Sequence, residues 1–125
     1  MPEAQFLLNS ISNHLAGYAY RYSSEVALHE SLAKVLQQQG FEVVQEYRLD
    51  ARNRVDFWIN GIVVEVKVDG SLSDALRQVN RYITLPDVKG VILAGTPRWA
   101  GEPLAQKPEW NGKPFKMVRL ARQFL

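Results

Sequence analysis

The sequence contains no cysteine, no low-complexity segment and no apolar run long enough to span a lipid bilayer. Without cysteine, the chain has neither a disulfide framework nor a thiolate metal site. A membrane-spanning helix needs about 20 apolar residues, and the sequence has neither such a run nor a basic leader followed by an apolar segment. We therefore expect a cytoplasmic protein that works in a reducing environment and has no membrane partner.

The composition is that of a folded protein rather than a disordered one. Of the 125 residues, 46% are hydrophobic and 22% are charged, which is close to the average for globular domains. No linker divides the chain, so we expect one domain over residues 1–125 with a substantial core. The formal net charge is only +2, which permits a polyanionic partner without requiring one.

Residues 55–68 predict a β-hairpin around which the rest of the chain is organised. Two apolar runs flank Asn60-Gly61, the dipeptide that best fits a two-residue type I′ turn. This turn places Asp56 opposite Glu65. Because side chains alternate along a strand, one face of the hairpin should be apolar, with Val55, Phe57, Ile59, Ile62, Val64, Val66 and Val68.

The other face of the hairpin predicts a metal site. Two like charges directly opposite each other destabilise a sheet, so Asp56 and Glu65 need a cation between them. Carboxylate oxygens are ligands that suit Mg²⁺ or Mn²⁺. Lys67 points to the same side as Glu65, where its ammonium group can position a water molecule or stabilise the negative charge of a phosphate.

This arrangement resembles the PD-(D/E)XK nuclease superfamily, in which an Asp is followed at a distance by Glu-x-Lys. Here the motif is Asp56, eight residues, and then Glu65-Val66-Lys67, and Val55 replaces the proline that usually precedes the aspartate. The resemblance implies a Mg²⁺- or Mn²⁺-dependent nuclease that hydrolyses DNA. Asp56, Glu65 and the Val66 carbonyl would bind the metal, and Lys67 would position the attacking water.

The resemblance also implies a fold. It predicts an α/β protein with a restriction-endonuclease-like αβββαβ core over about residues 23–96, in which helices flank a mixed sheet. The N-terminal helix and the C-terminal strand are additions to that core. Small members of the superfamily include Holliday-junction resolvases and nucleases encoded by phages or mobile elements, often as homodimers.

The spacing of apolar residues, together with capping and turn residues, predicts the elements around the hairpin. Helices are expected at 2–15, from Ser23 or Ser24 to 39, and at 72–85 with Ser71 or Ser73 as its cap. Strands are expected at 41–49, 88–94 and 113–120, the second of them parallel to its neighbour because a helix precedes it. Residues 96–112 read as a loop.

The second helix offers an additional acidic group. Taking 100° per residue, Glu25 falls on the apolar stripe of Leu28 and Leu32, whereas Glu30 faces solvent. In the resembled superfamily an acidic residue on this helix often completes the metal site, which makes Glu25 our choice. Stabilisation of the helix N-terminus explains Glu25 equally well. We expect His29 to be a structural group rather than a ligand.

The third helix carries a second family pattern. Gln78 and Tyr82 match the Gln-x-x-x-Tyr sequence that follows the Glu-x-Lys strand in the RecB-type branch of the superfamily. The match implies that Gln78 reaches toward the active site and Tyr82 toward the DNA. Arg77 and Arg81 on the same helix are candidates for phosphate contacts, although an exposed helix face explains them as well.

Three arginines precede the hairpin: Arg48, Arg52 and Arg54. Their position near the predicted metal site makes Arg52 and Arg54 candidates for gripping the DNA backbone. A solvated turn is the alternative explanation.

Two further functions remain open. The chain could be a nucleic-acid-binding module that keeps the nuclease fold without catalysis, but such modules typically lose Asp, Glu or Lys, and all three are present here. RNA is an alternative substrate, because nothing in the sequence indicates how a 2′-hydroxyl would be read.

Overall fold

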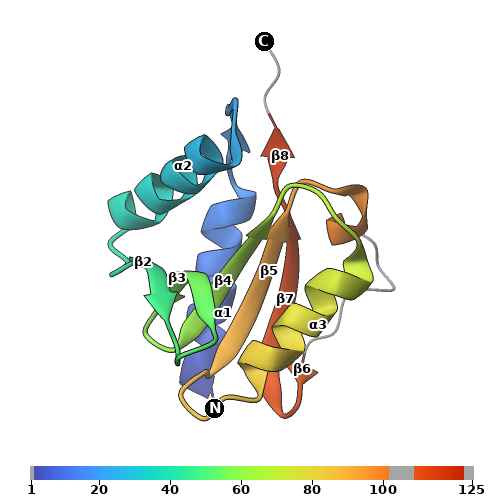
Figure 1. Cartoon of the computed structure of the whole chain (residues 1–125). Helices are drawn as coiled ribbons and strands as arrows, with labels where there is room; N and C mark the ends of the chain where they lie inside the picture. The colour runs from blue at the N-terminus through green and yellow to red at the C-terminus, as the bar shows by residue number, and fades with distance from the viewer. Residues whose placement is uncertain (1, 102–108, 123–125) are drawn as a thin grey trace.

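A mixed six-stranded sheet forms the centre of the structure, a computed structural model that describes residues 2–101 and 109–122 (Figure 1). Three α-helices lie among the described residues and make the fold α/β. In chain order the elements are α1 Pro2–Ala16, β1 Ala19–Tyr20, α2 Glu25–Gln38, β2 Val44–Arg48, β3 Arg54–Ile59, β4 Ile62–Lys67, α3 Leu72–Ile83, β5 Gly90–Gly95, the 3-10 helix η1 Arg98–Gly101, β6 Glu109–Trp110, β7 Lys113–Arg119 and β8 Ala121–Arg122.

The strands of the sheet are ordered β2-β3-β4-β5-β7-β6. Neighbours are antiparallel from β2 to β4 and parallel from β4 through β5 to β7, and β6 returns antiparallel to β7. β1 and β8 form a separate parallel pair. The predicted order of helix, three strands, helix and parallel strand is therefore present from α2 to β5.

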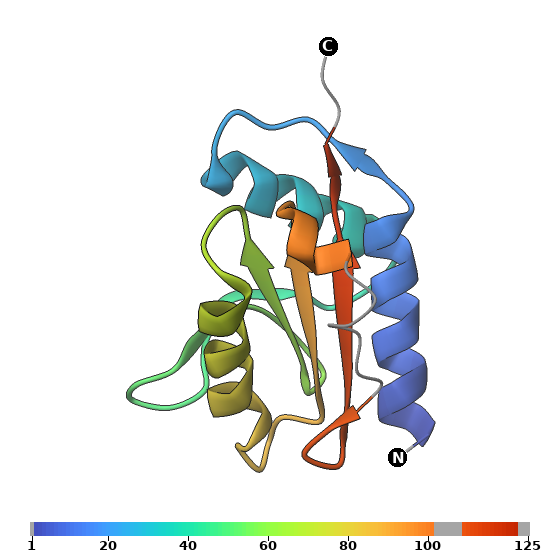
Figure 2. The same cartoon turned by 90° about the vertical axis from the view of Figure 1, so that its right-hand side faces the viewer.

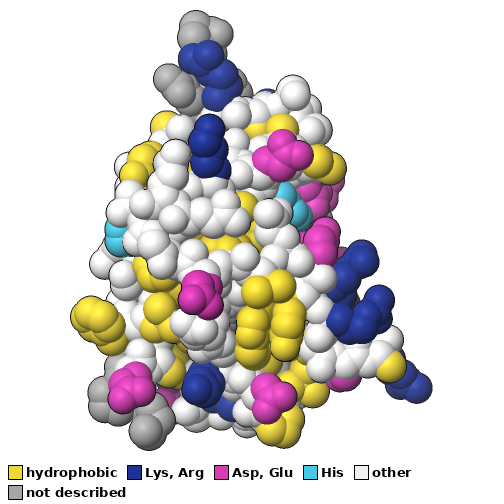
Figure 3. Space-filling view, turned by 90° about the vertical axis from the view of Figure 1, so that its left-hand side faces the viewer, with side chains coloured by type: hydrophobic (Ala, Val, Ile, Leu, Met, Phe, Trp, Pro, Cys, Tyr) yellow, Lys and Arg dark blue, Asp and Glu magenta, His cyan; other side chains and the backbone are white. Residues whose placement is uncertain are grey.

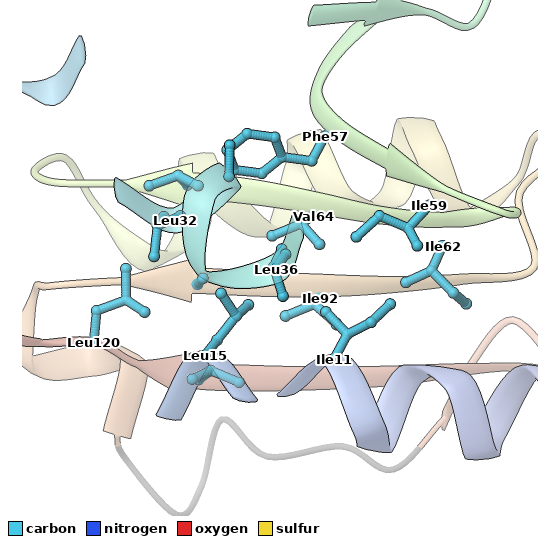
Figure 4. Close-up of a cluster of buried hydrophobic side chains, with 14 of the residues drawn as sticks. Ile11, Leu15, Leu32, Leu36, Phe57, Ile59, Ile62, Val64, Ile92 and Leu120 are labelled. Carbon is cyan, nitrogen blue, oxygen red and sulfur yellow. The ribbon is translucent and has the colours of Figure 1, made fainter. Parts of the chain in front are cut away.

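The helices form one layer on each side of the sheet. α1 and α2 pack on one face and α3 on the other, and Figure 2 shows α1 and α3 on opposite sides. Each face has its own core. The α1/α2 core joins the two helices to alternate residues of the hairpin (Figure 4). Its members include Ile11 and Leu32 from the helices, and Phe57, Ile62 and Val64 from the hairpin.

Side-chain caps fix where α2 and α3 begin. The Ser24 hydroxyl accepts a hydrogen bond from the Ala27 N–H, and the Ser71 hydroxyl accepts one from the Asp74 N–H. Each bond satisfies a backbone donor that the first helical turn leaves free. Both serines were among the caps predicted from the sequence.

The hairpin turn is confirmed. Asn60 and Gly61 have φ angles of 47° and 94°, the left-handed conformation that a type I′ turn requires. Beyond the turn, Ile59 pairs with Ile62, and two further pairs follow up to Phe57 and Val64. An additional reason favours glycine at the second position, because a Cβ on Gly61 would lie 2.9 Å from Cδ of Lys89.

The predicted apolar face of the hairpin is wrong at Val55. This residue packs with Val63 in the α3 core, whereas Phe57 packs in the α1/α2 core. The regular pairing of β3 with β4 ends at Phe57, and its pairing with β2 skips the position where Glu46 lies opposite Asp56. The alternation of side chains along β3 therefore fails at Asp56, which has no regular ladder partner in either β2 or β4.

The edge strand β2 is shorter than the predicted strand 41–49, and Figure 3 views the molecule from this side. The predicted loop 96–112 contains η1 and β6, and residues 102–108 of it lie outside the described residues. Among the described helices, none has both the length and the apolar character needed to cross a membrane.

Candidate metal site at the open end of the hairpin

Two carboxylates take over the backbone hydrogen bonds where the β3–β4 ladder opens. The Asp56 N–H donates to Oε1 of Glu65 over 3.2 Å, and the Val66 N–H donates to Oδ2 of Asp56 over 2.7 Å. Each side chain therefore crosses to the opposite strand and is held by a main-chain donor. This crossing brings Asp56 and Glu65 together, as the hairpin register predicted.

The environment of both carboxylates disfavours their charge. Glu65 is 4% exposed, and burial, together with the neighbouring Asp56 carboxylate, raises its pKa to about 8. Burial also raises the pKa of Asp56, although the Val66 N–H and His29 act in the opposite direction. Two adjacent acids whose pKa values are both raised are a common sign of a functional site.

Lys67 supplies a cation beside this pair. Its Nζ lies 3.9 Å from Oε2 of Glu65, so the ammonium group reaches the side of the hairpin predicted from the sequence. This one contact does not neutralise the carboxylate pair, because the pKa of Glu65 stays high in its presence.

Tyr82 does not lie where the family pattern predicted. It is 2% exposed, and its hydroxyl lies 3.5 Å from Oε2 of Glu65 and 3.4 Å from the Arg54 carbonyl. The predicted DNA contact is wrong, because Tyr82 falls on the buried stripe of α3 with Val79. Its hydroxyl instead donates toward the base of the carboxylate pair.

α2 brings Glu25 and His29 to the same place. Oε2 of Glu25 lies 3.6 Å from Nε2 of His29, which in turn lies 4.0 Å from Oδ2 of Asp56. The Glu25 side chain is 53% exposed, so its predicted burial is wrong. Glu25 sits in the first turn of α2, and burial along this helix begins at Leu28.

Glu46 is the residue that the sequence analysis missed. It lies on β2 opposite Asp56, with a φ angle of 51° that non-glycine residues rarely adopt. One ligand atom from each of His29, Glu46 and Asp56 lies within 4.8 Å of the other two. The sequence carried one signal for this position, Asp50 in the β2–β3 turn. Its carboxylate accepts hydrogen bonds from two backbone N–H groups and so fixes the register of β2 against β3.

Several of these groups line a concave region of about 350 Å³, which we call the acidic hollow. It is lined by Glu25, Val26, His29, Glu46, Arg54, Asp56, Glu65 and Gln78. Figure 3 shows acidic side chains gathered beside a histidine on this side of the molecule, with basic side chains next to them.

The remaining predicted residues divide into two groups. Gln78 and Arg54 line the acidic hollow, and Arg52 is exposed on the β2–β3 loop that leads to it. Arg77 and Arg81 instead border a shallow depression beside Trp110, on another side of α3, and Arg77 pairs with Asp74.

The chemistry of the site fits a divalent cation. Asp56 and Glu65 offer oxygen donors of the kind that Mg²⁺ and Mn²⁺ prefer. A cation near them would relieve the charge repulsion that raises the pKa of Glu65. His29 adds a nitrogen donor, because its Nε2 is buried and has no hydrogen-bond partner among the described residues.

No protein-family model, curated protein or solved structure matches this chain significantly. The function is therefore inferred from the geometry of the site.

Proposed function

We propose that this protein is a metal-dependent nuclease that hydrolyses phosphodiester bonds in DNA, with a PD-(D/E)XK-type site in a restriction-endonuclease-like core. The observation that carries the proposal is the crossed pair of carboxylates, the half-buried Asp56 and the buried Glu65, beside the Lys67 ammonium group. The order of elements from α2 to β5 supports the proposed core.

Each side chain has a separate task in this proposal. Asp56, Glu65 and the Val66 carbonyl would hold Mg²⁺ or Mn²⁺, and Glu25 would reach the cation through water, because it lies farther out. A divalent cation supplies Lewis-acid chemistry to a phosphate and lowers the pKa of a bound water. Lys67 orients the attacking water and stabilises negative charge on the phosphate.

The surroundings of the acidic hollow are consistent with a polyanionic substrate. Arg54 lines the hollow, Arg48 is exposed at the end of β2, and Arg52 is exposed on the adjoining β2–β3 loop. Phosphate contacts of this kind position a nucleic acid without reading its sequence. Gln78 also lines the hollow and would act at the active site, the role that the Gln-x-x-x-Tyr pattern implies.

A cleavage panel tests the proposal. Linear, circular, single-stranded and junction DNA, and RNA beside them, are incubated with the protein in Mg²⁺ or Mn²⁺. We expect DNA cleavage that falls at least about a hundredfold in Asp56→Asn and in Lys67→Ala. Asp87→Asn and Lys34→Ala are matched controls, since both residues are exposed outside the acidic hollow, and they should cleave like wild type.

Two results would contradict the proposal. Equal cleavage by wild type and Asp56→Asn would move the activity away from this site. Tight, metal-independent DNA binding without cleavage of any substrate would instead favour a non-catalytic nucleic-acid-binding module.

A further inference from the structure

We infer that a cavity at the turn end of the β3–β4 hairpin binds a small monocarboxylate with an aliphatic body, of the kind of a medium-chain fatty acid. The inference is independent of the proposed function, because no described residue lines both this cavity and the acidic hollow. It concerns binding, which is measured without DNA cleavage.

Four described segments line this cavity, which we call the turn-end cavity because Asn60 of the hairpin turn borders it. The other three are the first turns of α1, the connection from α3 to β5, and the β6–β7 turn. Figure 2 shows these three at the lower end of the molecule. The volume of the cavity is about 530 Å³, within the range of about 300–1,000 Å³ that is usual for small-molecule sites.

Much of the wall of the turn-end cavity is aliphatic. Ala4, Val88 and Pro114 are buried, Leu7 is half-buried, and Pro86 lies beside them. The described lining contains no aromatic ring, so it offers no stacking surface to a nucleobase or another flat ring system. An aliphatic chain is therefore the better match for this wall.

Two lysines give the turn-end cavity its positive charge. Lys113 is partly buried, and this burial lowers the pKa of its ammonium group. Among the described residues its Nζ donates to one acceptor, the Leu85 carbonyl, over 2.8 Å, although an ammonium group has three donors. Neither Lys113 nor Lys89 forms an ion pair with a described residue. A bound anion would give both ammonium groups a partner of opposite charge.

One acid, Glu3, is present in the described lining, and it does not cancel this charge. It is exposed in the first turn of α1, where an acidic side chain stabilises the helix N-terminus, and it forms no ion pair with either lysine. Two lysines and one glutamate leave an excess of one positive charge in this lining. The excess favours a ligand with a single negative charge over a phosphate or a polyanion.

Decanoate is the probe that tests the inference, in calorimetric titration of the full-length chain. We expect one decanoate per wild-type chain, and NMR amide shifts should change most around the turn-end cavity. Shorter acids should bind more weakly, by up to about fourfold for each methylene group removed. Decanol has the same chain without the charge, and it should bind at least tenfold more weakly than decanoate.

Lysine-to-methionine variants test the charge while keeping an apolar side chain of similar length. Lys113→Met should weaken decanoate binding at least tenfold, since a hydrogen bond to a charged group contributes about 1.5–3 kcal/mol. Because Lys113 also binds the Leu85 carbonyl, Lys89→Met is a second variant and should weaken binding too. Lys116→Met is the matched control, since Lys116 lies on the same strand outside the cavity, and it should bind like wild type. Thermal melts check that each variant is folded.

The inference is overturned if decanoate does not bind, if decanol binds as tightly, or if both cavity variants bind decanoate like wild type. Amide shifts around the turn-end cavity that change with protein concentration alone would show that a second copy of the chain occupies it, which would also contradict the inference. A protein that binds decanoate and does not cleave DNA would contradict the proposed nuclease alone. One that cleaves DNA and does not bind decanoate would contradict this inference alone.

Discussion

The two ends of the β3–β4 hairpin are built on opposite principles. At the turn end, Asn60 and Gly61 take the backbone conformation they favour, and three residue pairs follow in regular register. At the open end the pairing stops, and the carboxylates of Asp56 and Glu65 bind backbone N–H groups in its place. The strand residues next to the turn are buried and apolar, whereas the open end places two acidic side chains close together.

The two ends of the hairpin therefore contribute differently: the turn end stabilises the fold, and the open end holds the candidate site. The turn-end residues Ile59, Ile62 and Val63 are fully buried, and burying such a side chain stabilises a protein by about 1.5–3 kcal/mol. Placing two carboxylates next to each other away from water has the opposite effect, because each disfavours the charge of the other. The turn end can thus hold the open end in an arrangement that would not form alone, and such local strain is typical of functional sites.

The largest effect should come from the turn end. Ile62→Ala removes a fully buried side chain from the α1/α2 core, and we expect it to lower the free energy of unfolding by about 2–5 kcal/mol. Urea denaturation measures this loss. The stabilisation by divalent cations should remain, because the Ile62 side chain does not contribute to the acidic hollow. Val44→Ala, a half-exposed residue on β2, is the control and should change stability little.

The open end should respond to pH. Burial, together with the neighbouring Asp56 carboxylate, raises the pKa of Glu65 from the ordinary 4.5 to about 8, so the folded chain binds this proton more tightly than the unfolded chain. The resulting stability is present at low pH and is lost as the pH rises through 8. The melting temperature of the metal-free protein should therefore fall between about pH 5 and pH 9.

The control for this pH dependence is Glu65→Gln, which cannot ionise at that position. Its melting temperature should change much less over the same range. Parallel curves for wild type and Glu65→Gln would mean that Glu65 is not the group responsible.

A smaller effect is expected at the rim of the open end. Glu25 lines the acidic hollow but is half-exposed, whereas Glu30 faces solvent on the same helix. Glu25→Gln should slow DNA cleavage about tenfold, equivalent to about 1.4 kcal/mol, and Glu30→Gln should be close to neutral. An inactive Glu30→Gln beside an active Glu25→Gln would show that the orientation of α2 is wrong.

Effects of similar, modest size concern residues with left-handed backbone at the two ends. Gly61→Ala should destabilise the protein by about 1–2 kcal/mol, because alanine disfavours this backbone conformation. The new Cβ would also lie too close to the Lys89 side chain. Glu46→Gly should have the opposite sign and stabilise the metal-free protein by up to about 1 kcal/mol, because glycine accepts the φ of 51° without strain. Thermal melts measure both, and a destabilised Glu46→Gly would contradict the comparison.

The sequence predicted the turn end well because the signals there are local. Asn60-Gly61 specifies its own turn, and the turn then determines which residues of β3 and β4 face each other. The serine caps of α2 and α3 are equally local. From these the helix and strand order followed, and so did the meeting of Asp56 with Glu65.

The open end was predicted less completely because it depends on contacts between distant segments. The β2–β3 register places Glu46 opposite Asp56. This register depends on the loop between the two strands, which Asp50 shapes through its hydrogen bonds. Where the β3–β4 ladder opens, Val55 packs in the α3 core instead of the α1/α2 core. The alternation of apolar residues in the sequence does not show this change. Tyr82 was assigned by a family pattern, although its helical phase with Val79 already indicated a buried position.

The central claim is that the open end keeps the carboxylates of Asp56 and Glu65 together for a divalent cation. The most direct test is the melting temperature of wild type and Asp56→Asn, each with and without millimolar Mn²⁺ or Mg²⁺. Wild type should be stabilised, by about 2.7 kcal/mol when the cation is at 100 times its dissociation constant. Asp56→Asn should melt higher than wild type without metal and should not respond to the cation. No shift in wild type, together with an unchanged metal-free melting temperature in Asp56→Asn, would contradict the claim.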